Sequence, residues 1–141
     1  MDHLRDVRSQ RAEVRSAMGA LEEAVAAPAA DPETWRKTAA VAVDRMETAL
    51  DAHVDVTEGP DGLFAGILRD APRLGHGIDV LRREHEHLRS AVRSLAARLQ
   101  EPVEVAEARE EALALMAAIV RHRHRGADLV YEAYQTDLGG G

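Results

Sequence analysis

Four segments of this chain place apolar residues at alternating steps of three and four, and this spacing limits its fold more than any other feature. Residues spaced in this way lie on one side of an α-helix, so each segment predicts a helix with one buried face. Helices with such seams pack nearly parallel in a bundle. The predicted core residues are, segment by segment, Leu4, Val7, Val14, Met18, Leu21 and Val25; Ala39, Val43, Met46 and Leu50; Leu74, Ile78, Leu81, Leu88, Val92, Leu95 and Leu99; and Leu113, Met116, Val120, Ala127, Tyr131 and Tyr134.

Proline and glycine residues mark where these helices begin and end. Asp31-Pro32 supplies an N-cap followed by a proline in the first turn of the second helix, and Gly59-Pro60 ends that helix. A short helix is expected from about Gly62 to Arg69, and Pro102 closes the third long helix. Because the links are short, successive long helices should be antiparallel neighbours. The sequence therefore predicts an all-α fold, an antiparallel up-down-up-down four-helix bundle with a short extra helix between the second and third long helices.

Length and composition exclude several classes of function. The 141 residues are enough for one domain that is stable without a metal, so we expect a bundle over residues 1–135 and a flexible tail at 136–141. The chain has no cysteine, which leaves nitrogen and oxygen as the only metal ligands. A net charge of −7 and four aromatic residues argue against nucleic acid. No apolar run is long enough to cross a membrane, and the first residues do not resemble a signal peptide, so we expect a cytoplasmic protein without a membrane partner. We also expect a monomer or a weak homodimer.

One polar residue interrupts each of the four apolar stripes. These residues are Arg11, His53, His85 and His124. Counted from one end of the bundle at about 1.5 Å per residue, their heights span only about 9 Å. We therefore expect a single polar layer inside the bundle, which needs partners because unpaired polar groups are costly in an apolar interior.

Two carboxylates are candidates for completing this layer. Asp128 follows His124 by four residues and so lies on the same face of its helix, while Glu58 follows His53 by five at a point where Gly59 lets the chain turn. Three imidazoles and two carboxylates at one level make a coordination sphere suited to iron, manganese or zinc. His122 is a weaker candidate because it lies about 200° round the helix from His124.

Three local motifs resemble those of the hemerythrin-like family, the HHE cation-binding domains. They are HVDVTEGPDGLF from His53, LRREHEHLRSAV around His85 and HRGADLVYEAY from His124, and the likeness runs from about Val7 to Tyr134. The resemblance implies a four-helix bundle around a non-haem di-iron centre, held by five histidines and two bridging carboxylates and used for oxygen binding or for iron or redox sensing. It also implies that His53, His85, His124 and Asp128 are ligands.

The chain departs from the family pattern at three expected ligand positions. Arg11, Leu81 and Thr57 occupy them, with Glu58 beside Thr57 as a substitute. We therefore predict a reduced site with one metal ion, iron first, with zinc or manganese as alternatives. Its function would be to bind or sense a small molecule such as dioxygen, peroxide or nitric oxide. The residues expected to support the ligands are Arg11, Thr57, Arg89, His122 and Tyr131.

Two other functions fit the same residues. One is a metal-dependent oxidase or hydrolase acting on a small molecule, with Glu58, His122 or Tyr131 as proton donor. The other is a metal-free structural or regulatory bundle in which Arg11 pairs with Glu58 or Asp128, because a guanidinium binds carboxylates well.

Overall fold

The computed structural model describes residues 2–136 of the chain, with side chains over residues 5–134. Within these residues all regular structure is helical, and four long helices are present, so the predicted all-α class is confirmed. None of the described helices is long and apolar enough to span a membrane. The elements are α1 (Asp2–Ala26), α2 (Pro32–Glu58), α3 (Leu63–Asp70), the 3-10 turn η1 (Pro72–Leu74), α4 (Gly75–Arg98), α5 (Val105–Tyr131) and the π-helical turn η2 (Glu132–Thr136).

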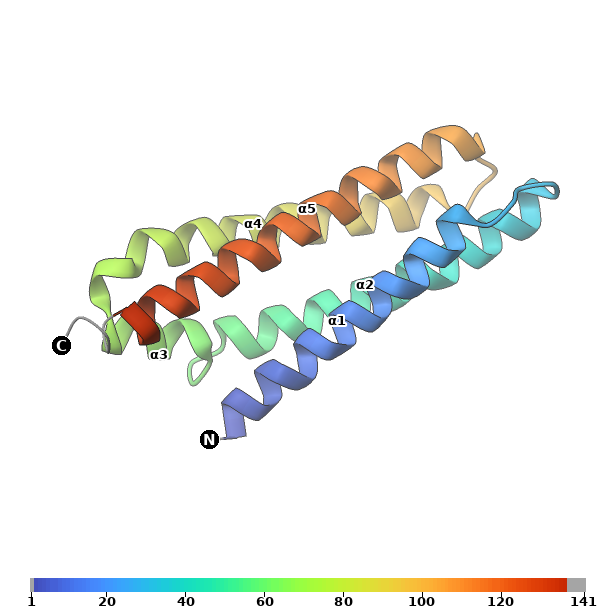
Figure 1. The fold of residues 1–141 in the computed structure, drawn as a ribbon. Coiled ribbons are helices and arrows are strands. Elements are labelled where there is room, and N and C mark those ends of the chain that lie inside the picture. The colour runs from blue at the N-terminus through green and yellow to red at the C-terminus, as the bar shows by residue number, and fades with distance from the viewer. Residues whose placement is uncertain (1, 137–141) are drawn as a thin grey trace.

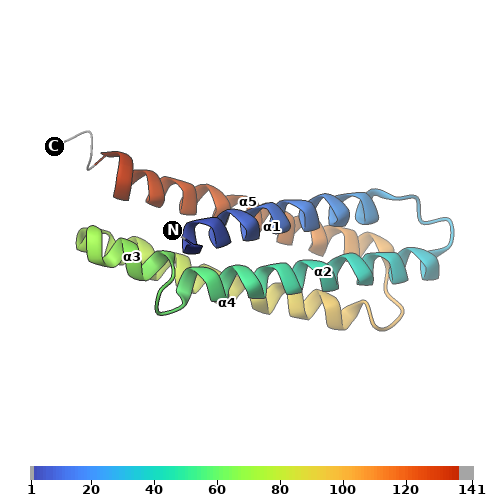
Figure 2. The same cartoon turned by 90° about the horizontal axis from the view of Figure 1, so that it is seen from below.

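The long helices lie side by side, and their connections gather at two ends (Figure 1). The α1–α2 and α4–α5 connections lie together at one end, which we call the loop end. The short helix α3 lies at the opposite end, the α3 end, where α5 also finishes (Figures 1 and 2). The predicted tail at 136–141 overlaps this description only at Thr136, and residues 137–141 lie outside it.

The ends of α2 follow from local chemistry. Asp31 caps the first turn, accepting hydrogen bonds from the Glu33 backbone N–H at 3.2 Å and from Thr34 Oγ1 at 2.8 Å. At the other end Gly62 packs so tightly against α2 that a Cβ there would lie 2.5 Å from the carbonyl oxygen of Val56. Only glycine allows this approach, which brings α3 close against the last turn of α2.

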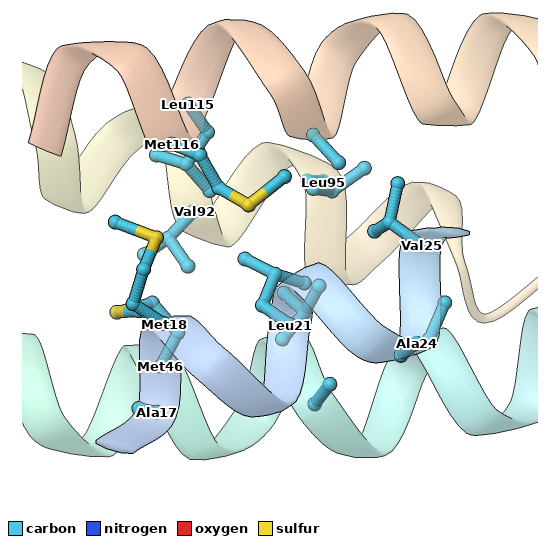
Figure 3. Close-up of a cluster of buried hydrophobic side chains, with 14 of the residues drawn as sticks. Ala17, Met18, Leu21, Ala24, Val25, Met46, Val92, Leu95, Leu115 and Met116 are labelled. Atoms are coloured by element: carbon cyan, nitrogen blue, oxygen red, sulfur yellow. The ribbon is translucent and has the colours of Figure 1, made fainter. Parts of the chain in front are cut away.

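The loop-end half of the bundle is a closed apolar core. Side chains from all four long helices meet there, among them Leu21, Met46, Leu95 and Leu115 (Figure 3). Arg109 from α5 donates to the carbonyl oxygens of Val25 and Ala27, and Arg36 from α2 donates to that of Leu99. The carbonyls that the ends of α1 and α4 leave free are thus satisfied by arginines.

The first three predicted stripes are confirmed wherever their side chains are described, but in the fourth only Met116 is buried and the predicted face is wrong. Leu113 is 59% exposed, Val120 38% and Tyr131 62%. The buried face of α5 is instead made by Ala108, Ala112, Leu115, Met116, Ile119, His122 and Leu129. The misassignment arose because residues 112–120 are all apolar, so that two neighbouring faces of the helix carry the same spacing.

Candidate metal centre

Three histidines from three different helices converge near the middle of the bundle. His53 comes from α2, His85 from α4 and His122 from α5. One ring nitrogen of each lies within 4.8 Å of the others, and their ring centroids are 4.6–5.9 Å apart. His85 is 1% exposed and His122 6%. This cluster is therefore a buried meeting point of imidazoles.

Two of the rings are held from outside by glutamates. His85 Nδ1 lies 2.5 Å from Glu58 Oε2, and His122 Nδ1 lies 2.8 Å from Glu84 Oε1. An ionised carboxylate can only accept, so in each ring Nδ1 carries the proton and donates, which leaves the lone pair on Nε2. Glu84 also accepts from Arg125 at the surface. Carboxylates on the outer nitrogens of histidines are the arrangement that orients metal-binding imidazoles and raises their basicity.

The inner nitrogens lack partners of their own. His53 Nδ1 and His85 Nε2 are buried and make no hydrogen bond to any described residue. A buried polar atom left unpaired costs about 1–3 kcal/mol, so native structures rarely leave one without a reason. A metal ion bound to these lone pairs would remove that cost, so the donor set fits a cation.

The electrostatics of the cluster favour the ligating form of each ring. Burial, helped by the nearby His85, His122 and Arg11, lowers the pKa of His53 to about 3. Burial and the neighbouring His122 and Arg89 lower the pKa of His85 to about 3, and burial lowers that of His122 to about 4. All three imidazoles are therefore neutral at pH 7, and protons do not compete with a metal there.

The last turn of α2 and the short helix α3 close one side of the cluster. Thr57 is buried, and its hydroxyl donates to the backbone carbonyl of His53 at 2.8 Å, which tightens this turn. Phe64 of α3 stacks on the His85 ring, with centroids 5.7 Å apart and planes 13° from parallel. Arg82 also lies over the Phe64 ring, 6.0 Å from its centroid. An aromatic ring thus shields His85 from water.

Beside the cluster lies a cavity of about 300 Å³ between α1, α3 and α5. Its buried walls are mainly apolar, and the exposed or half-buried Arg11, Arg15 and Arg123 line its outer part. Burial and the charge of Arg123 lower the pKa of Arg11, so these two guanidinium groups repel each other. The cavity is lined by Arg11, Arg15, His53, Thr57, Leu63, Phe64, Ile67, Leu81, Val120, His122, Arg123, His124, Gly126, Ala127, Leu129 and Val130.

The structure brings together some of the predicted ligands and moves others away. His53, His85 and Glu58 meet, with Glu58 on the outer nitrogen of His85. His124 is exposed, and it lines the cavity without joining the cluster. Asp128 is exposed and belongs neither to the cluster nor to the cavity wall. The prediction that His124 points inward is wrong, because it followed the exposed stripe of α5.

His122 takes the inward place that was predicted for His124. A signal in the sequence could have found it, since Ala108, Ala112, Leu115, Ile119, His122, Gly126, Leu129 and Ala133 continue one unbroken alternation of four- and three-residue steps. Glu84 was missed altogether. It immediately precedes His85 and so points to a different side of α4, toward α5.

Some of the residues expected to support the site lie at it, and others lie away from it. Thr57 lines the cavity, and His122 belongs to the cluster itself. Arg89 Nε lies 3.1 Å from Asp51 Oδ1, so it forms an ion pair beside the site, and Tyr131 is exposed away from the cavity. Arg11 forms no ion pair with any described carboxylate, so its predicted pairing with Glu58 or Asp128 is absent.

Comparison with known proteins gives one match, to a family of sequences. No curated protein and no solved structure matches the chain. The sequence model of the hemerythrin HHE cation binding domain matches residues 2–134, which is nearly the whole length. The chain therefore belongs to the hemerythrin HHE cation-binding domain family.

Proposed function

We propose that this protein binds one metal ion through His53, His85 and His122, and that the ion takes up a small molecule from the adjoining cavity. The observation that carries the proposal is that two ring nitrogens of this histidine cluster, His53 Nδ1 and His85 Nε2, are buried without hydrogen-bond partners among the described residues. The proposed small molecule is dioxygen, peroxide or nitric oxide, bound for sensing or protection. His53 and His122 line the cavity, so an ion bound to them would be reached from it.

The surrounding residues favour one ion over two. Beyond the three histidines the cavity wall continues with Arg11, Thr57 and Leu81, which offer a second cation neither an imidazole nor a carboxylate. The one further imidazole on the wall, that of His124, is exposed and stands apart from the cluster. Glu58 and Glu84 are engaged with the outer nitrogens of histidines. A second positive ion would also meet the guanidinium of Arg11 without any compensating negative charge.

The donor set also ranks the metals. Neutral imidazoles suit iron and zinc, whereas manganese prefers oxygen ligands, which this cluster presents only from its outer side. We therefore propose iron, with zinc as the second candidate. When bound, such an ion supplies an open position that polarises or exchanges electrons with a small molecule.

The protein's own contribution is orientation and exclusion of water. Glu58 and Glu84 fix the rings of His85 and His122 so that both lone pairs face inward. Phe64 covers the His85 ring, and Thr57 holds the α2 turn that carries His53. The enzyme alternative loses two of its three proposed proton donors, because Tyr131 lies away from the cavity and His122 belongs to the cluster.

The test is a metal titration of the purified, metal-free protein. Cobalt(II) serves as a spectroscopic probe, and iron(II) is titrated without oxygen. We expect one ion per chain. His122→Ala should weaken binding at least tenfold, whereas His124→Ala, a matched change on the exposed side of the same helix, should leave it unchanged.

Far-UV circular dichroism and thermal melts of each variant establish that the bundle is intact before affinities are compared. A wild-type protein that takes up none of cobalt, iron, zinc or manganese would overturn the proposal. Loss of binding in His124→Ala with retention in His122→Ala would instead return the site to the ligand set predicted from the sequence.

A further inference from the structure

The cavity is larger than the proposed small molecules need. A molecule such as dioxygen occupies about the space of one or two waters, at roughly 30 Å³ each in the liquid. The cavity holds about 300 Å³, which is the lower end of the range for organic ligands. Most of its volume is therefore left for a second, larger occupant.

The charge on the cavity is one-sided. Arg11, Arg15 and Arg123 line it, and none of its lining residues is acidic. None of these three arginines forms an ion pair or hydrogen bond with another described residue. In a chain of net charge −7, three guanidinium groups around one cavity without a carboxylate favour an anion there over a cation.

Arginines elsewhere in the fold show the contrast. At the loop end Arg36 and Arg109 donate to backbone carbonyl oxygens at 2.6 Å. Along α2 and α4, Arg45 and Arg93 pair with glutamates. Arg8, Arg83 and Arg121 also lack partners among the described residues, but they are exposed and do not line the cavity. Arg11, Arg15 and Arg123 differ from them because all three line one cavity.

The inner wall indicates the rest of the ligand. Leu63, Phe64, Ile67, Leu81 and Leu129 are all buried and all face the cavity. A hydrated inorganic anion would gain nothing from these side chains, whereas a hydrocarbon or aromatic group would be taken out of water against them.

We propose that the cavity binds a small monocarboxylate with an apolar body, its carboxylate at Arg11, Arg15 and Arg123 and its body against the wall formed by α3 and α5. This inference rests on the proposed function, because it names the class of molecule that lies beside the metal centre. Binding itself requires only the cavity, so it can be measured on the metal-free protein.

The test compares three probes by isothermal titration calorimetry on metal-free protein. Hexanoate carries both features, hexanamide carries the apolar body without charge, and inorganic phosphate carries charge without the body. We expect hexanoate to bind at one saturable site, at least tenfold more tightly than either of the others. Hexanamide binding equally well would overturn the role of the arginines, and phosphate binding equally well would overturn that of the apolar wall.

Two pairs of variants locate the site. Arg11→Gln should weaken hexanoate at least tenfold, while Arg8→Gln, an exposed arginine one turn earlier that does not line the cavity, should not. Gly126→Leu should abolish binding by filling the cavity. Gly19→Leu is its control, because a Cβ at either glycine meets nothing within 4 Å and only Gly126 lines the cavity.

Cobalt titration of the same samples separates the two proposals. If hexanoate fails to bind the wild-type protein while cobalt binds at one equivalent, the carboxylate site is overturned and the metal centre stands. If hexanoate binds as expected and cobalt does not, the cavity is a ligand site but the proposed metal centre is overturned. Equal loss of hexanoate in Arg8→Gln and Arg11→Gln would show a general charge effect and would also overturn the inference.

Discussion

The two halves of this bundle are built from the same four helices but are filled differently. The loop-end half is closed by apolar side chains, with Leu21 and Val43 fully buried, and its arginines have acceptors (Figure 3). The α3-end half holds three histidines, a cavity of about 300 Å³ and arginines without partners. The α3-end half also contains a smaller apolar cluster that includes Ile67 and Ile78. Both halves therefore stabilise the fold, but only the α3-end half combines apolar packing with buried polar groups that lack partners.

This combination carries an energetic cost in the α3-end half. Buried imidazoles are kept neutral, two of their nitrogens lack partners, and the repulsion between Arg11 and Arg123 goes uncompensated. Each of these features destabilises a protein that binds nothing, and each is relieved by a cation or an anion. Three measurements test this difference between the two halves.

The largest effect should come from acid, and mainly through the histidine half. Above pH 6.5 the three histidines are neutral in both the folded and the unfolded chain, so stability is fully present. As the pH falls below 6.5, the unfolded chain binds protons that the folded one refuses until about pH 3 to 4. In that range the free energy of unfolding should fall by about 1.4 kcal/mol per pH unit for each histidine. For all three together the fall is about 4 kcal/mol per pH unit.

The measurement is urea unfolding of metal-free protein between pH 7 and 4.5. His53→Leu should reduce the pH slope of the free energy of unfolding by about a third, because it removes one of the three buried histidines. His53 is the choice because its Nδ1 has no described hydrogen-bond partner that the substitution would leave unpaired. Glu58 acts in the opposite sense, since burial raises its pKa and the folded state binds its proton more readily. A slope in His53→Leu as steep as in the wild type would show that the buried cluster does not govern acid stability.

The second prediction compares the loss of stability caused by a leucine-to-alanine substitution in each half. Leu21→Ala, in the closed core, should lower the free energy of unfolding by about 3–5 kcal/mol. Leu81→Ala should cost about half as much, because Leu81 already borders a cavity and loses fewer contacts. Urea unfolding at pH 7 measures both. Equal losses would mean that the cavity is closed in solution and that the two halves are packed alike.

Most of the fold could be predicted from the sequence because three of the four stripes have only one apolar face. The polar residues around Val14, Met46 and Leu88 leave no choice of which side is buried. In α5 the choice was open, since residues 112–120 are apolar on every side. A helix of that kind is set by what it packs against, which local spacing does not contain.

Two of the three clustered histidines were predicted as ligands from the sequence, and the third only as a supporting residue. His53 and His85 lie on helices that have only one apolar face, and both side chains belong to the cluster. His122 was set aside in favour of His124 because the face of α5 had been misassigned. Glu84 and the arginines of the cavity act across helices, so their roles depend on packing distances that a single sequence does not give.

The smallest effect compares one glycine from each half. Gly19 of α1 and Gly126 of α5 both lie inside helices, and a Cβ at either would meet no atom within 4 Å. Gly19→Ala and Gly126→Ala should each raise the free energy of unfolding by about 0.5–1 kcal/mol, because alanine restricts the unfolded chain more than glycine does. Thermal melts of the metal-free variants measure this. A gain in Gly19→Ala with none in Gly126→Ala would mean that the space beside Gly126 is taken up in solution, and the contrast between a filled and an open half would then be lost.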